Sequence, residues 1–355
     1  MSGPALEGEV TARAADAAGA GVVSAGSPAS RPGEGPQPDA HTSEAPVLGI
    51  DAGGSSARWL LMRLDGEVVA QGRVGPVSAI DLDREESPAR ENLEELLRAS
   101  SAVALPQRVV AGVTGLDTAS PQARRLEETI CERLGLEDGA VTVLGDVVTA
   151  YLSAFDPGAG VLVYAGTGSV AVHVAHDGTI VRAGGHGYLI DDAGGGYWIG
   201  REALKRLLRA ADATGSPPKS KLASAVYGAL GGSDWATVRA AVYGGGRSRV
   251  AALTPAVALA ATRGDPAARE VLAEAGRELA RLATVVFGRL GQVMPVALAG
   301  GVAGAGPELV EPMRDALPAG TPLTVSKAPP VTAAAELARR LATGERTLPQ
   351  SWLAE

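Results

Sequence analysis

Three glycine-rich turns hold residue types that suit contact with phosphate. The first, Gly-Gly-Ser-Ser, follows Asp51 and Ala52; the second reads Gly-Thr-Gly-Ser at residues 166–169; the third is the Gly-Gly pair at residues 300–301. Glycine leaves backbone N–H groups open to an anion, because no Cβ blocks the approach. The predicted phosphate ligands are Gly53, Gly54, Ser55, Ser56, Gly166, Thr167, Gly168, Ser169, Gly300 and Gly301.

A single glycine turn is weak evidence, since ordinary hairpins use the same residues. Here all three turns follow apolar runs, at residues 47–50, 161–164 and 296–298. Each run is typical of a strand that ends in a turn. The coincidence of three such units favours phosphate binding over chance.

Two carboxylates follow similar strands. Asp51 ends the first apolar run and is predicted to lie beside Mg²⁺, through water, because Mg²⁺ keeps much of its hydration shell. Asp146 follows the apolar run at residues 141–144, and open α/β sheets bind ligands at the carboxyl ends of their strands. Because aspartate also favours helix N-caps, capping is the alternative role for Asp146.

The elements that carry these residues are repeated. The Asp-Gly pair at 65–66 follows the first glycine turn at the same spacing as the pair at 177–178 follows the second. Each pair joins two apolar runs, which is a strong hairpin signal. Strand, glycine turn, strand, Asp-Gly turn and strand therefore occur twice, and we expect two similar half-domains.

Strand-like and helical segments alternate between the repeats. Helices are predicted at residues 82–99 and 121–134, and strands at 109–114 and 141–144. This alternation indicates an α/β fold. Two lobes are expected, because 355 residues exceed what one hydrophobic core usually supports.

The predicted division has three parts. Residues 1–45 hold few large apolar side chains and are expected to be a disordered tail. Residues 46–155 form the N-terminal lobe. Residues 156–355 form the C-terminal lobe, with a helical insertion at about 197–290, where Ala- and Leu-rich patterns dominate.

Composition narrows the class of partner. The net charge of −8, with scattered Lys and Arg, disfavours nucleic acid, so a small-molecule substrate is expected. The apolar runs are too short to cross a membrane. The single cysteine, Cys131, cannot form an internal disulfide, which is consistent with the cytoplasm.

The glycine turns resemble those of the actin-like ATPase superfamily, with DAGGSS and AGTGS as phosphate loops and LAGGVAG as an adenosine loop. Nearly everything after residue 46 is similar to N-acetylglucosamine kinases of the BadF/BadG/BcrA/BcrD ATPase family. That likeness is carried by AGVTG, LGDVVTAY and RAGGHGYLIDDAGGGYWIGREALK. It implies duplicated ribonuclease H-like domains with ATP and Mg²⁺ in the cleft between two lobes.

The resemblance also implies roles for single residues. Asp146 matches the catalytic aspartate, which accepts the proton of the acceptor hydroxyl. The residues expected to contact sugar are Thr114, Gly115, Asp146, Gly184, Gly185 and Asp192. Capping of the following helix is the alternative for Asp192. Residues 75–80 lack the Asn that often contacts sugar in this family, so recognition of an acetamido group stays open.

These features predict an amino-sugar kinase that makes N-acetylglucosamine 6-phosphate. Glucosamine kinase is one alternative, and a regulatory ATPase module without sugar transfer is the other. An ATPase activator would need cluster-binding cysteines, and a sugar-sensing repressor would need a helix-turn-helix. The chain has one cysteine, too few for a cluster within one chain, and the residues before Val47 are not helical enough for a helix-turn-helix domain. The sugar and the oligomeric state, including a homodimer, are left open.

Overall fold

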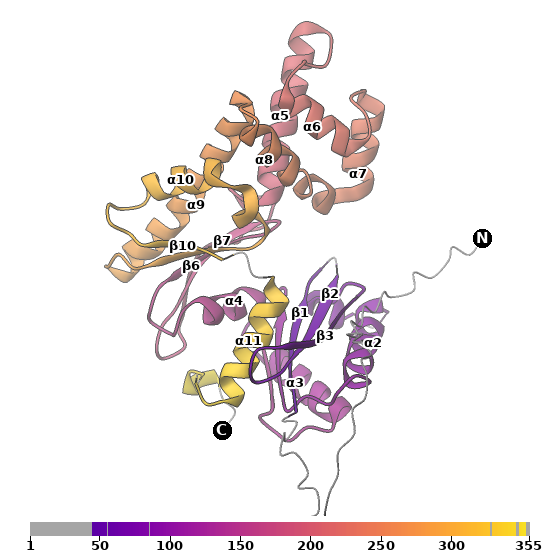
Figure 1. Cartoon of the computed structure of the whole chain (residues 1–355), viewed down its shortest axis with the longest axis vertical. Coiled ribbons are helices and arrows are strands. Elements are labelled where there is room, and N and C mark those ends of the chain that lie inside the picture. The colour runs from indigo at the N-terminus through magenta and orange to yellow at the C-terminus, as the bar shows by residue number, and fades with distance from the viewer. Residues whose placement is uncertain (1–44, 55, 85, 327–328, 346–347, 353–355) are drawn as a thin grey trace, which may run out of the picture.

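The protein has two lobes, each built on a five-stranded sheet (Figure 1). The computed structural model describes residues 45–54, 56–84, 86–326, 329–345 and 348–352. Of the tail predicted at 1–45, all but Ala45 lies outside the described residues, as does Ser55 of the first glycine turn.

The first sheet has the strand order β3-β2-β1-β4-β5. The strands are β1 (Val47–Ala52), β2 (Ala57–Met62), β3 (Val68–Val74), β4 (Arg108–Val113) and β5 (Val141–Gly145). The β1, β2 and β3 strands run antiparallel as consecutive hairpins, whereas β4 and β5 pair in parallel beyond β1. The carboxyl ends of β1, β4 and β5 therefore meet at one edge of the sheet.

The second sheet repeats this topology with the order β10-β9-β6-β7-β8. Its strands are β6 (Val161–Ala165), β7 (Ser169–Val174), β8 (Ile180–Gly184), β9 (Val296–Ala299) and β10 (Leu323–Val325). The correspondence of β6, β7 and β8 to β1, β2 and β3 confirms the repeat predicted from the spacing of the Asp-Gly turns.

Two helices, α2 (Pro88–Ser101) and α3 (Pro121–Leu134), pack on one face of the first sheet. Ser87 and Ser120 cap them, and each has proline in its first turn. The predicted helix at 82–99 was wrong at its start, because the short α1 (Ala79–Leu82) ends before Ser87 begins a new helix.

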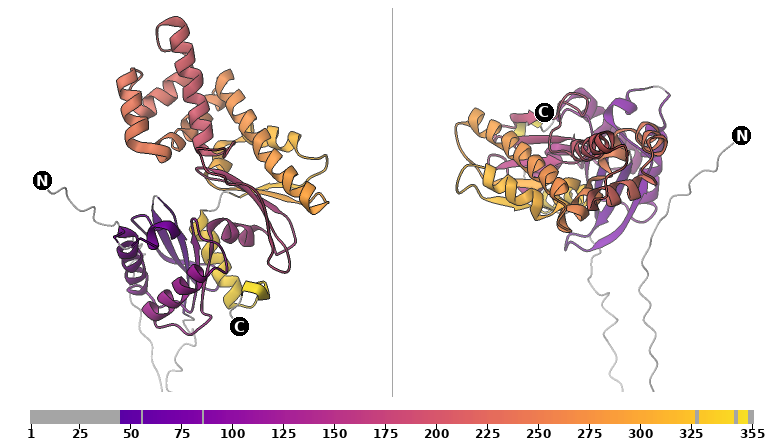
Figure 2. Two further views of the ribbon diagram at one scale, coloured as in Figure 1. Left: turned by 180° about the vertical axis from the view of Figure 1, so that it is seen from behind. Right: turned by 90° about the horizontal axis from the view of Figure 1, so that it is seen from above.

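The second lobe carries the helical segment predicted after residue 194. It consists of α5 (Gly196–Thr214), α6 (Lys221–Leu230), α7 (Trp235–Ala251), α8 (Thr254–Thr262) and α9 (Pro266–Leu290). From behind, α5 to α8 form the far end of this lobe, while α9 lies along the sheet (Figure 2).

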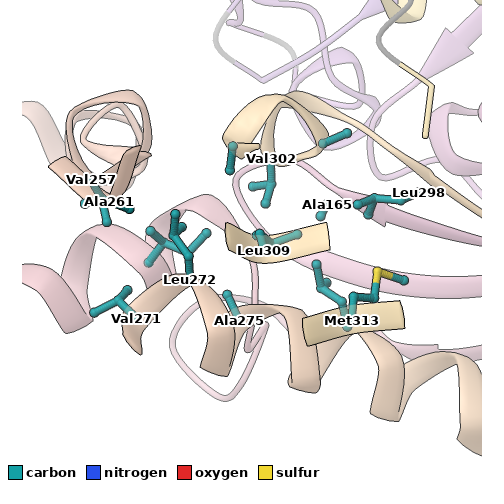
Figure 3. Close-up of a cluster of buried hydrophobic side chains, with 14 of the residues drawn as sticks. Ala165, Val257, Ala261, Val271, Leu272, Ala275, Leu298, Val302, Leu309 and Met313 are labelled. Carbon is teal, nitrogen blue, oxygen red and sulfur yellow. The ribbon is translucent and has the colours of Figure 1, made fainter. Parts of the chain in front are cut away.

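The core of the second lobe lies between its sheet, α8, α9 and α10 (Pro307–Ala316), which follows the short 3₁₀ helix η1 (Gly301–Ala305). Figure 3 shows Leu272 and Ala275 of α9 against Leu309 of α10. A Cβ on Gly276 would overlap the Leu309 carbonyl oxygen, so glycine is what lets α9 and α10 approach this closely.

Two helices fill the space between the sheets. The helices are α4 (Asp146–Ala154) and α11 (Pro330–Ala342), which precedes the short η2 (Gln350–Trp352). They share one buried cluster with side chains of both sheets, including Leu60 and Leu162. The predicted division at residues 155 and 156 stays a prediction, but α11, which it places in the second lobe, packs on β1 and β4 of the first.

Gly49 allows α11 to approach β1, because a Cβ at this position would overlap the backbone nitrogen of Ala335. We expect Gly49→Ala to lower the free energy of unfolding by about 1–3 kcal/mol, the usual range for overpacking a core. Urea denaturation followed by circular dichroism measures it. Gly228→Ala is the matched control, since a Cβ there meets no atom within 4 Å. Equal stabilities of the two variants would contradict the packing of α11 on β1.

Among the described residues, none of the helices combines the length and the apolarity needed to cross a bilayer.

Candidate active site

The predicted residues of the first lobe lie at the edge where β1, β4 and β5 end. Asp51 pairs in register with Gly112 of β4, and Asp146 is the first residue of α4, directly after β5. A Cβ on Gly112 would lie 3.1 Å from Thr149 Oγ1 and 3.5 Å from the Asp146 Cα. Asp51, Gly112, Asp146 and Thr149 line one small cavity, so the two carboxylates share a site.

Asp146 is held by two hydrogen bonds. Thr114 Oγ1 donates to Oδ2 at 2.9 Å, and the backbone N–H of Val147 donates to Oδ1 at 2.9 Å. Capping was the wrong alternative, because Gly145 occupies the N-cap position and Asp146 is the first helical residue. The start of α4 adds a positive helix dipole that favours a carboxylate. The two hydrogen bonds thus fix the orientation of the Asp146 carboxylate.

Thr114 and Gly115 form the turn after β4. The backbone N–H of Thr114 donates to the Ala52 carbonyl at 2.9 Å, and the Thr114 carbonyl accepts from Ala79 at 3.1 Å. Gly115 has φ +79°, a conformation that favours glycine. The structure therefore brings Thr114 and Gly115 beside Asp146, at the edge where the first glycine turn begins.

Burial raises the pKa of Asp51 to about 6, with Arg58 lowering it and Asp146 raising it further. Two carboxylates that share a buried site repel each other, and a divalent cation would relieve that repulsion. Across the described part of the chain, no three His, Cys, Asp or Glu side chains gather as metal ligands. This donor set fits Mg²⁺, which uses one or two carboxylates together with water and phosphate oxygens.

The second glycine turn is interlocked with the segment at residues 191–196. The backbone N–H of Gly196 donates to the Gly166 carbonyl at 2.8 Å, and that of Tyr197 donates to the Thr167 carbonyl at 2.9 Å. A Cβ on Gly195 would lie 2.7 Å from the carbonyl carbon of Gly168, so glycine is required for this contact. The two motifs are one structural unit.

Asp192 is buried against this unit and has φ +55°. Its carboxylate lies so close to Gly168 that a Cβ there would overlap Oδ2, and Oδ1 accepts the N–H of Gly187 at 3.1 Å. Burial raises the pKa of Asp192. Capping was wrong here too, because Gly195 is the N-cap of α5. Asp192 therefore adjoins the second glycine turn.

Gly184 and Gly185 lie on the other side of the same turn. Gly185 donates its N–H to the Ser169 carbonyl at 2.9 Å, and both glycines have positive φ, +77° and +69°. The hydroxyl of Ser169 donates to the Ala193 carbonyl at 2.7 Å. The predicted sugar ligands are thus divided: Thr114, Gly115 and Asp146 lie in the first lobe, and Gly184, Gly185 and Asp192 lie in the second.

The other two turns are placed differently. Gly53 donates its N–H to the Ser56 carbonyl at 3.2 Å, which closes the first turn. Gly300, with φ +94°, packs on the backbone of Ala165, and a Cβ there would lie 2.5 Å from the Ala165 carbonyl oxygen. Around Gly301, a Cβ would meet no atom of another described residue within 4 Å, its chain neighbours aside. The second and third turns therefore adjoin, while the first lies in the other lobe.

One residue of this region was missed by sequence reasoning. Tyr164 of β6 packs on the buried cluster shared by the two sheets, and burial, with the charges of Asp146 and Asp51, raises its pKa. With Gly300 it lines a cavity of about 310 Å³ that also reaches α4 and α11. Its position, two residues before the second glycine turn at the end of an apolar run, could have marked Tyr164 in the sequence.

Residues 48–320 match the BadF/BadG/BcrA/BcrD ATPase family. An N-acetylmuramic acid/N-acetylglucosamine kinase of Clostridium acetobutylicum is 28% identical to the chain over 240 residues, which are 66% of this chain and 76% of that protein. An N-acetyl-D-glucosamine kinase of Dictyostelium discoideum is 26% identical over 188 residues, covering 49% of this chain and 57% of that protein.

Solved structures share the fold. One from Chromobacterium violaceum, classed as an N-acetylglucosamine kinase, is 27% identical with a TM-score of 0.61 and covers 83% of this chain and 99% of that one. A ROK family glucokinase of Streptomyces griseus, in complex with glucose and AMPPNP, is 18% identical with a TM-score of 0.54, and the match covers 83% of this chain and 99% of that one. The two-lobed actin-like fold predicted from the glycine turns is confirmed. Because the family match spans most of the sequence, the chain belongs to the BadF/BadG/BcrA/BcrD ATPase family.

Proposed function

We propose that the protein is an ATP-dependent kinase that transfers the γ-phosphate to a hydroxyl of an amino sugar, with N-acetylglucosamine as substrate and its 6-phosphate as product. The observation that carries this proposal is Asp146, fixed by Thr114 at a sheet edge beside Asp51. A module that only bound nucleotide would not need a second oriented carboxylate there. The two kinases named above as relatives support the same substrate class.

Asp146 acts as the general base. Its Oδ2 accepts the proton of the sugar hydroxyl as that oxygen becomes the nucleophile, and the remaining catalysis is positioning. The hydrogen bonds from Thr114 and from the Val147 N–H hold the carboxylate in one orientation. The base is therefore preorganised for proton transfer before the sugar binds.

The glycine turns would hold the phosphates of ATP. Gly54 and Ser56 of the first turn, and Thr167 and Gly168 of the second, would offer N–H and hydroxyl donors from opposite lobes. The Gly53 and Gly166 N–H groups and the Ser169 hydroxyl are used inside the turns and hold their shape. Asp51 would hold Mg²⁺ through water, and the metal would supply positive charge to the phosphate oxygens. Gly300 and Gly301 would contact the adenosine end.

The sugar would lie between the two groups of predicted ligands. Thr114 and Gly115 offer contacts from the first lobe, and Gly184, Gly185 and Asp192 from the second. A polyol needs several fixed donors and acceptors, and the backbone groups of the positive-φ glycines are of this kind. Since the two groups lie on different lobes, binding of sugar would draw the lobes together.

A panel of sugars with Mg-ATP tests the proposal. It should include N-acetylglucosamine, glucosamine, N-acetylmuramic acid and glucose, with ADP release measured continuously and the phosphorylated product identified by mass spectrometry. We expect the highest kcat/KM with N-acetylglucosamine. A higher kcat/KM with glucosamine would mean that glucosamine, not N-acetylglucosamine, is the substrate. ADP release that no sugar accelerates would contradict the proposed kinase activity and indicate an ATPase without a sugar acceptor.

A further inference from the structure

Arg247 of α7 lies outside the predicted site but close to its first glycine turn. The α7 helix is broken before it: residues 244–246 are three consecutive glycines, and Gly246 has φ 57° and ψ −155°, outside the helical region. Such a conformation is accessible to glycine and costly for other residues. The break redirects the chain, so Arg247 leaves the helical path that precedes it.

The guanidinium reaches the opposite lobe. A Cβ placed on Gly54 would lie 3.4 Å from Arg247 Nη2, which puts this nitrogen within contact distance of the first glycine turn. Arg247 belongs to the helical segment of the second lobe, whereas Gly54 follows β1 of the first. A cationic group from one lobe therefore stands over the predicted phosphate-binding backbone of the other.

A second set of contacts ties Arg247 to the second glycine turn. Its guanidinium carbon lies 5.8 Å from the centroid of the Tyr188 ring, and that ring packs edge-on against Tyr197 at 4.8 Å between centroids. The Tyr197 N–H donates to the carbonyl of Thr167 in the second turn. Arg247 is thus linked through two aromatic rings to the second turn, while its guanidinium lies beside Gly54 of the first.

The anchoring leaves the hydrogen-bond donors of Arg247 available. A guanidinium over an aromatic face is held through its π face, so its N–H groups in the plane remain free to donate. Among the described residues the Arg247 side chain is exposed and pairs with no carboxylate. An unpaired guanidinium between two phosphate-binding turns is suited to bidentate contact with phosphate oxygens.

We propose that Arg247 is a catalytic residue that binds the oxygens of the transferring phosphoryl group. This inference rests on the proposed function and adds a residue from the helical segment to its site. Arg247 neutralises the charge that spreads over the phosphoryl oxygens as the bond to the leaving oxygen of ADP breaks and the bond to the sugar oxygen forms. Because Arg247 comes from the second lobe and lies beside Gly54 of the first, its contact with the phosphoryl group would link the two lobes.

The test compares Arg247→Ala with Arg239→Ala. Arg239 is an exposed residue of the same helix and serves as the matched control. We expect Arg247→Ala to lower kcat by about 10²–10³-fold, the range seen when one donor to a developing negative charge is removed. KM for the sugar should stay within about threefold, since the ground state keeps its other contacts. Arg247→Lys should retain part of the rate, because it keeps the charge without the planar fork.

Binding provides a readout that does not depend on turnover. Calorimetry should show that the wild type and Arg239→Ala bind Mg-ADP more tightly when aluminium fluoride, an analogue of the transferring phosphoryl group, is present. Arg247→Ala should bind Mg-ADP as the wild type does but lose most of this gain. Guanidinium ion added to Arg247→Ala should restore part of the rate.

Two results would overturn the inference: a kcat of Arg247→Ala equal to that of Arg239→Ala, or a slow variant that keeps the aluminium fluoride gain and is not rescued by guanidinium. The second pattern would mean that Arg247 only packs on Tyr188. If the wild type phosphorylates no sugar of the panel, the proposed function fails. The aluminium fluoride comparison still decides the role of Arg247, because it needs no acceptor.

Discussion

Asp146→Asn should lower kcat for phosphate transfer by about 10²–10⁴-fold, the usual effect of losing a general base. Asparagine keeps the shape of the side chain and can still accept the hydrogen bond from Thr114, but its amide cannot take the proton of the sugar hydroxyl. Affinity for Mg-ADP and the melting temperature should change little. Steady-state kinetics with the preferred sugar measures the first, and calorimetry and thermal unfolding measure the others.

Asp138→Asn makes the same chemical change at an exposed residue before β5 and serves as the control. A rate for Asp146→Asn close to that of this control would remove Asp146 from the chemistry and leave it a structural role at the start of α4. Thr114→Val should have a smaller effect on kcat, because it leaves the base in place and removes the hydrogen bond that orients it together with the predicted hydroxyl contact to sugar.

Asp51→Asn should have opposite effects on stability and on activity. In the ligand-free protein burial raises the pKa of Asp51 to about 6, so above that pH the folded state holds an ionised carboxylate that it disfavours. A raised folded-state pKa means that this charge costs stability at neutral pH, and that the cost shrinks as the pH falls from about 6 toward the ordinary value of 3.8. Replacing the charge with an amide should increase the free energy of unfolding by about 1–3 kcal/mol at pH 7.

The same substitution should impair use of Mg-ATP, because the metal loses its anchoring carboxylate. We expect kcat/KM for Mg-ATP to fall by about 10–100-fold, the usual cost of losing an outer-sphere metal partner, and the Mg²⁺ concentration for half-maximal rate to rise. Titration of Mg²⁺ at fixed ATP measures this, and urea unfolding without ligands measures stability. An unchanged Mg²⁺ requirement would show that Asp51 has a structural role only; a loss of stability would show that its charge is favourably paired in the fold.

Local patterns predicted much of the fold because they reflect local physics. The glycine turns after apolar runs and the spacing of the Asp-Gly pairs predicted the repeated strand units, and both sheets have the same strand order. The bounds of α3 follow from Ser120 and Pro121 at its start and Gly135 at its end. The start of α2 was missed because the polar, Leu-spaced pattern continued across Ser87, whose side chain caps the helix.

Long-range contacts could not be predicted in the same way. Gly49 and Ala335 are far apart in the sequence, and only the folded chain shows that α11 returns to β1. Gly195 and Gly168 also lie far apart in the sequence, and only the folded chain shows that the missing Cβ of Gly195 permits their backbone contact. In both cases the glycine is required by a neighbour that local periodicity does not reveal.

The sequence by itself determined which residues could do chemistry, because a carboxylate or a glycine turn at the end of an apolar strand offers the same chemical groups wherever that strand lies in the fold. Only the tertiary structure decided which of them share a site. It placed Asp51 and Asp146 around one small cavity, joined Asp192 to the second glycine turn, and brought Arg247 over Gly54 of the opposite lobe. The physical reason is that strand order, helix packing and the break at Gly246 set distances between residues that are remote in the chain, and no local propensity encodes those distances.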